Sequence, residues 1–245
     1  MRFPEVAVNG IYRRLIPSKF PTIDVYERLG PQAVRDEAVR LEELTNPRLI
    51  SKARILAASE GMSPPASVQL QNWNHAPFTY PNIEGSYLLP SPFPVLELAS
   101  NIKGALARAI LRREAFLSRT ADPPQGLDMR VISNSVVGTF VDLRASCDKL
   151  DQQAIWSIGK DLYNGGAMGA LFTIPEILGS QFAAIFSKAC LVESAVQAAH
   201  YRFQWDGNSI SKIYDFADGK DLTRGQILSS NSFDLASTDV KTSDH

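Results

Sequence analysis

The chain has few of the residues from which metal sites, disulfide frameworks and histidine-based catalysis are built. Its 245 residues include two cysteines and three histidines, and one of those histidines is the last residue. Cys147 and Cys190 form no metal-binding or redox motif, so we expect two reduced, buried thiols. The same scarcity argues against a histidine-rich metal site.

Charge of one sign and long apolar runs are also missing. The 25 basic residues are balanced by 26 acidic ones, which predicts no general affinity for nucleic acid or for an anionic membrane. No apolar run approaches the roughly 20 residues that a membrane helix needs. Pro4 and Glu5 stand where a secretory signal would have its apolar stretch, so we expect a cytoplasmic protein.

What the chain does contain is a hydrophobic content of 44%, enough for a substantial core. Its patterns predict helices over 30–60, 100–118 and 152–164, and strands within 129–143, 169–186, 201–205 and 209–214. Neither a repeat nor a clear linker interrupts them. The prediction is therefore one α+β domain over residues 1–230, followed by a disordered tail, rich in Ser, Thr and Asp, over 231–245.

Several local features refine this outline. Ser100 is a candidate N-cap for the second helix, and the apolar side chains of that helix form a stripe that leaves Arg108 well to one side. The alternating prolines at 90, 92 and 94 exclude a central strand there. Gly165 and Gly166 are expected to end the third helix. Asp206-Gly207 suits a two-residue type I′ turn between the last two strands.

The residues alone reveal no active site. His75 and His200 are the candidates for a catalytic histidine, but histidines satisfied by local hydrogen bonds are far more common. The pairs Arg13-Arg14 and Arg112-Arg113 could contact phosphates, although solvated surfaces explain most such pairs.

A resemblance of several segments to a known protein family implies more about fold and function. The segments that carry it are IYRRLIPSKFPTIDVYERLG (11–30), LEELTNPRL (41–49), FTYPNIEGS (78–86), REAFLSRTADPPQGLDMRV (113–131) and HYRFQWDG (200–207). In this order and wording, the chain resembles the RES-domain family. That family splits NAD, and its members are commonly the toxin half of bacterial toxin–antitoxin pairs. The resemblance implies a compact α+β fold similar to the ADP-ribosyltransferase toxins, with NAD in a cleft between sheet and helices.

The positions that correspond to the family's catalytic side chains carry other residues. The family's phosphate-binding Arg maps onto Tyr87, its pocket Tyr onto Glu97, its catalytic Glu onto Arg108 and its Ser onto Ile174. A histidine that commonly precedes the REAF motif is Arg112 here. An arginine in place of the carboxylate opposes the positive charge that develops on the ribose when the bond to nicotinamide breaks. The resemblance therefore implies a member of the family that has lost its catalytic residues and that needs no metal or cofactor. NAD would be a substrate only if activity persists.

Several interpretations stay open. Glu97 and Arg108 could pair across the former pocket and fill the NAD space, could form a relocated active site, or Arg108 could simply face water. Whether Glu84 or Glu176 reaches the pocket is also open.

The leading functional hypothesis is a non-catalytic protein that binds an Xre-type antitoxin or a homologous RES protein, with a homo-oligomer as a further option. The alternative is an active NAD glycohydrolase, NAD phosphorylase or ADP-ribosyltransferase with displaced catalytic residues. A purely structural or oligomerising module is a third, weaker class.

Overall fold

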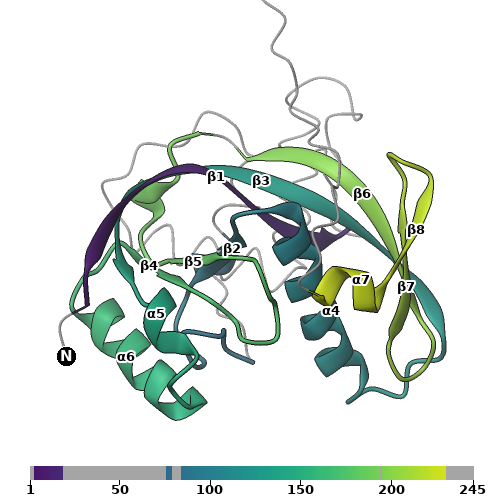
Figure 1. The fold of residues 1–245 in the computed structure, drawn as a ribbon, viewed down its shortest axis with the longest axis horizontal. Coiled ribbons are helices and arrows are strands. Elements are labelled where there is room, and N and C mark those ends of the chain that lie inside the picture. Colours follow the sequence, from purple (N-terminus) through teal and green to yellow (C-terminus); the bar gives the residue numbers. More distant parts are fainter. Residues whose placement is uncertain (1–2, 19–75, 79–83, 194, 230–245) are drawn as a thin grey trace, which may run out of the picture.

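The computed structural model describes residues 3–18, 76–78, 84–193 and 195–229. The expected helix over 30–60, His75 and the expected tail over 231–245 lie outside these residues. The described part is an α+β arrangement in which helices pack beneath a mixed sheet (Figure 1). The α+β prediction is thereby confirmed. None of the helices in this part is long and apolar enough to cross a membrane.

The elements follow one another along the chain with these bounds: β1 (Glu5–Pro17), β2 (Leu96–Ala99), α4 (Ile102–Leu117), β3 (Gln125–Asp142), α5 (Arg144–Cys147), α6 (Gln152–Asn164), β4 (Gly169–Phe172), β5 (Phe182–Ile185), η2 (Lys188–Cys190), β6 (Val196–Trp205), β7 (Ile210–Asp215), β8 (Lys220–Thr223) and α7 (Arg224–Leu228).

The eight strands form one sheet in the order β1-β2-β5-β4-β3-β6-β7-β8, and β1 also pairs with β3. This extra pairing joins β1, β2, β5, β4 and β3 into a closed ring, from which β6, β7 and β8 extend. Only the β3–β4 pair is parallel among the pairings of the described strands. In Figure 1, β1, β3 and β6 arch over the molecule, with α4 and α7 below one end and α5 and α6 below the other.

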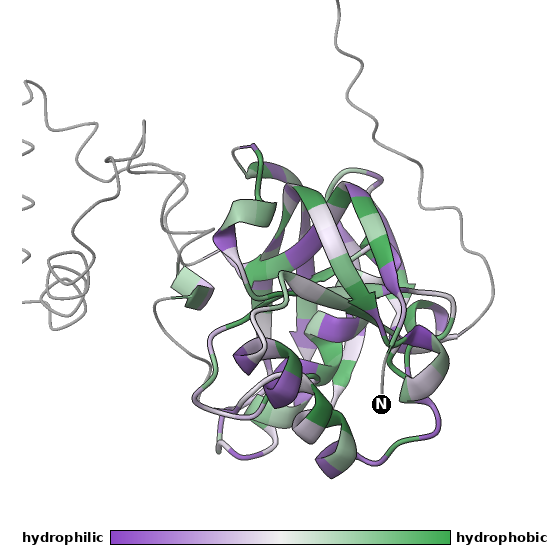
Figure 2. Cartoon of the chain, turned by 90° about the vertical axis from the view of Figure 1, so that its left-hand side faces the viewer, coloured by the Kyte–Doolittle hydropathy of each residue, from purple (hydrophilic) through white to green (hydrophobic). Residues whose placement is uncertain are grey.

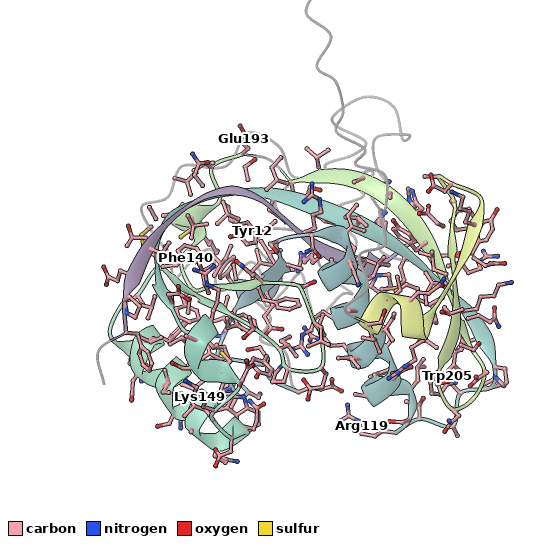
Figure 3. All side chains as sticks on the ribbon, in the orientation of Figure 1. Tyr12, Arg119, Phe140, Lys149, Glu193 and Trp205 are labelled. Carbon is pink, nitrogen blue, oxygen red and sulfur yellow. The ribbon has the colours of Figure 1, made fainter. Side chains whose placement is uncertain are left out.

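Alternation along the strands divides the buried residues into two cores. The smaller core takes residues from all five ring strands, including Val8, Leu98 and Phe140, so the ring encloses it. The larger core packs α4, α5 and α6 against the strands and contains Leu106, Phe172 and other side chains. Figure 2 shows hydrophobic residues concentrated along the strands, and Figure 3 shows Phe140 among the strands while Glu193 lies at the outside.

Several expected boundaries are confirmed. Helix α6 spans Gln152–Asn164 as predicted, and it ends at Gly165 with Gly166 in the left-handed region at φ 78°. The strands expected within 169–186 are β4 and β5. The alternating prolines lie outside any strand. Both cysteines are free and buried.

Two local predictions were wrong, and one strand begins earlier than expected. The N-cap of α4 is Asn101, whose side chain accepts a hydrogen bond from the N–H of Gly104, because the helix starts one residue later than Ser100 allows. One or two strands were expected within 129–143, and β3 confirms this as a single strand of 18 residues, although it begins earlier, at Gln125, directly after the Pro-Pro break. Trp205 pairs with Ile210, so the β6–β7 turn has four residues; a shift in register at Trp205 replaces the expected two-residue turn.

Candidate functional site

A pocket of about 370 Å³ lies between the end of β1, strand β2 and helix α4. Its apolar wall includes Leu98, Ala109 and Phe182. The charged residues lining it in the described part of the chain are five arginines and one glutamate: Arg13, Arg14, Arg108, Arg112, Arg113 and Glu97. The pocket is therefore strongly cationic although the whole chain is close to neutral.

Strand alternation brings Glu97 to this pocket. Its neighbours Leu96 and Leu98 belong to the core inside the ring, so Glu97 points to the opposite face, toward α4. Its side chain is only 5% exposed. One carboxylate oxygen accepts a hydrogen bond from the Tyr87 N–H at 2.7 Å, and the other accepts one from Arg108 at 2.8 Å. Arg112 lies 3.7 Å from this second oxygen.

Helix periodicity explains why two arginines reach the same carboxylate. Arg108 and Arg112 are separated by one helical turn on α4 and therefore share a face. Burial by itself would raise the pKa of Glu97, but the attraction of Arg108 and Arg112 and the two hydrogen bonds outweigh it and lower that pKa. The carboxylate is ionised and held in place by these partners.

The surrounding arginines are crowded. Burial lowers the pKa of Arg14 to about 10, and repulsion from Arg112 adds to the effect. Burial also lowers the pKa of Arg112, and the attraction of Glu97 offsets this decrease only in part. The pKa of Arg113 is lowered by burial and then by Arg112. A bound anion would relieve this repulsion, because it favours the charged form of each guanidinium.

A second pocket of about 250 Å³ lies on the other side of Arg108 and Arg112, which line both. Tyr87 and Trp156 contribute to its wall. The Tyr87 ring stacks on Phe172 with 5.3 Å between ring centroids, and burial raises its pKa to about 12, with smaller contributions from nearby Cys147 and acidic residues. The Trp156 indole N–H donates to the Ser86 carbonyl at 3.2 Å.

Three of the four positions taken from the resemblance come together. Tyr87, Glu97 and Arg108 are joined by the hydrogen bonds described above. Ile174 is 3% exposed in the larger core and lines neither pocket.

The structure also decides between the interpretations of Arg108. Its side chain is 21% exposed and bonded to Glu97, so the prediction that it simply faces water was wrong. The buried face of α4 is wider than the expected apolar stripe, because Ala105 and Ala107 also belong to the core. The hypothesis that Glu97 and Arg108 pair is confirmed; whether the pair occupies a former NAD space stays a prediction.

Among the other acidic candidates, Glu84 lines the second pocket and Glu176 lines neither. Both arginine pairs line the first pocket, where each of the four residues is partly exposed. Trp156 was missed because its position in an amphipathic helix is typical of ordinary core packing.

Within the described residues, no group of three or more His, Cys, Asp or Glu could hold a metal ion. The arginines are the groups suited to a ligand, since guanidinium ions bind phosphate and carboxylate oxygens in a bidentate manner.

The fold and pocket thus define an α+β protein with a mixed, partly closed sheet and an arginine-lined pocket. No family model matches the chain. A protein of Sinorhizobium fredii (strain NBRC 101917 / NGR234), named "Uncharacterized protein y4oC", is 39% identical over 224 residues, which are 91% of this chain and 95% of that protein. The chain belongs to the same family as y4oC.

Proposed function

We propose that this chain is a RES-type protein that no longer splits NAD and acts by binding. One observation carries the proposal. Glu97 is the acidic residue among the described residues that line the cationic pocket, and its carboxylate is bound by Arg108, Arg112 and the Tyr87 N–H. A carboxylate stabilises the developing ribose cation only if its charge is available. Here that charge is neutralised, and the arginines around it would oppose a cation.

The same pocket is suited to an anionic ligand. Five arginines around one carboxylate leave an excess of positive charge in a concave, partly buried site. Such a site favours a phosphate-bearing small molecule, which would be held without being cleaved. A protein partner, an antitoxin or a homologue of this chain, remains the second part of the proposal and is supported by the retained RES-like segments.

The alternative of an active NAD-consuming enzyme has one observation in its favour. Glu97 lines the pocket, and a ligand phosphate could attract Arg108 away and free the carboxylate. We rank it second because Arg112 also lies within ion-pair distance of Glu97.

The first test is incubation of the purified protein with NAD, with and without inorganic phosphate, while NMR follows nicotinamide release beside an active RES protein. We expect no release. Release that Glu97→Ala abolishes would overturn the proposal and establish a relocated active site.

Binding is tested separately, by the shift in melting temperature with pyrophosphate and with ADP-ribose. We expect an upward shift that Arg112→Gln reduces and that Arg202→Gln leaves unchanged. Arg202 is a suitable control because it pairs with Asp128 at an exposed site outside the pocket. A shift of zero for both probes would exclude a phosphate ligand and leave only the protein partner.

A further inference from the structure

The two edges of β1 differ in their hydrogen bonding. β1 pairs with β3 over its whole length without a break in register, from Glu5 opposite Val141 to Pro17 opposite Met129. At the two ends, the Asp142 N–H donates to the Pro4 carbonyl and the Ser18 N–H donates to the Asp128 carbonyl. Antiparallel pairing alternates, so the even-numbered residues of β1 bond β3 and the odd-numbered residues direct their N–H and C=O groups to the other edge.

Along the first half of β1, no strand of the described part of the chain covers that other edge. Among the described residues, β2 contacts it only through the pair Arg13 and Ala99. The backbone N–H and C=O groups of Glu5, Ala7 and Asn9 therefore have no strand beside them within the described part of the chain. The Ile11 carbonyl accepts a hydrogen bond from the Arg13 side chain at 3.4 Å. Figure 1 shows this half of β1 at the border of the molecule.

The open segment has few of the devices that usually protect an edge, Glu5 being its one charged residue. EVAVNGI, residues 5–11, contains neither lysine nor proline, and its four odd-numbered residues are exposed. Its length exceeds that of the other outer strand, β8, which has four residues and carries Lys220 and Asp221. An exposed edge of this length and composition is a template for pairing with another strand.

We infer that the open edge of β1 pairs antiparallel with the same edge of a second copy of this chain. Two-fold pairing about Val8 would place Glu5 opposite Ile11 of the copy and Ala7 opposite Asn9. The segment has a single charge, Glu5, and this register sets no like charges opposite each other. Ile11, 54% exposed, would gain a neighbour, and the two sheets would become continuous. The inference is independent of what occupies the arginine pocket.

The test is sedimentation equilibrium of the full chain over a wide concentration range, without ligand. The wild type should be a reversible dimer. Ala7→Pro removes an N–H from the open edge and none from the β3 ladder, so it should raise the dissociation constant about tenfold or more, equivalent to about 1.4 kcal/mol. Ala7→Ser keeps that N–H and should dimerise as the wild type does. Thermal melts of each variant show whether the monomer fold is retained.

Asn9→Lys is the second variant, for use if the proline substitution impairs folding. It leaves the backbone N–H groups unchanged and places two lysines, one from each copy, diagonally across the two-fold axis. Because the two positive charges repel each other, this variant should also weaken the dimer. A wild type that is monomeric at all concentrations would overturn the inference. A dimer that both Ala7→Pro and Asn9→Lys leave unchanged would overturn it equally, because the contact would then lie elsewhere.

Discussion

At the scale of single residues, Glu97 decides what the pocket can do. A buried carboxylate survives in an apolar setting only when charges and hydrogen bonds compensate its lost hydration. Glu97 has that compensation from Arg108, Arg112 and the backbone of Tyr87. The interactions that keep the carboxylate ionised also compensate its charge within the pocket.

Glu97→Gln should therefore lower the free energy of unfolding at neutral pH. Removing one partner of a buried pair costs about 3–5 kcal/mol, and we expect roughly 1–3 kcal/mol because Arg108 and Arg112 are 21% and 39% exposed and can reach water. Chemical denaturation at pH 7 measures the change. Asp221→Asn is the control, because Asp221 forms an exposed ion pair with Lys212, and this substitution should change stability little. Glu114→Gln is unsuitable as a control, because Glu114 binds both Arg224 and the Ile210 N–H.

The pH dependence follows from the same group. The pKa of Glu97 is lowered in the folded protein, so its stabilising contribution is fully present above its ordinary pKa of 4.5 and is lost as pH falls through the lower, folded value. The stabilities of the wild type and Glu97→Gln should converge on acidification below that range. A constant difference between the two down to the acid transition would contradict the lowered pKa.

At the scale of elements, α6 is held against the segment before β2 by a close backbone approach. A Cβ atom on Gly159 would lie 2.0 Å from the Leu88 carbonyl oxygen, so only glycine fits there. The Gln152 side chain and the Trp156 indole bond the carbonyls of Tyr87 and Ser86 at the same contact. This contact positions Tyr87, whose N–H binds Glu97.

Gly159→Ala should consequently destabilise the protein by about 1–3 kcal/mol or more, despite the better helix propensity of alanine. Gly225→Ala is the matched control, because Gly225 lies in helix α7 and a Cβ atom there would have open space around it within the described part of the chain. That control should be neutral or stabilising by up to about 1 kcal/mol. Equal effects at both sites, measured by urea denaturation, would show that the contact is dispensable.

At the scale of the whole molecule, β3 links the two ends of the described structure. It pairs with β1 along one edge, and with β4 and β6 along the other. Helix α6, which carries Trp156, and Trp205 of β6 lie at different ends of the molecule (Figures 1 and 3), and Trp205 is only 1% exposed. A strand shared by both ends should make them unfold together.

Two single-tryptophan variants can test this coupling. One keeps Trp156 and the other keeps Trp205, with the remaining tryptophans replaced by phenylalanine. Within each variant, the urea midpoint from fluorescence should coincide with the midpoint from far-UV circular dichroism. A fluorescence transition that precedes the loss of secondary structure in either variant would mean that its end of the sheet opens separately.

Local patterns in the sequence were sufficient for much of the fold. Helix α6 was predicted with its bounds because an amphipathic period and a Gly-Gly end are both local signals. The β6–β7 hairpin was predicted from its strands and Asp-Gly, but its turn was not, because a shift in register at Trp205 depends on how the two strands pair. The pairing of Glu97 with Arg108 was anticipated only as one of several interpretations.

The sequence by itself determined which residues are apolar, where the chain turns and which side chains share a helix face, since these properties depend on neighbours within a few positions. Only the tertiary structure decided that Arg13 and Arg14 of β1 line the same pocket as Arg112 and Arg113 of α4. It also decided that, among the described strands, none pairs with the first half of one edge of β1. Both depend on which faces and edges of distant elements meet, and periodicity within an element carries no information about its partner.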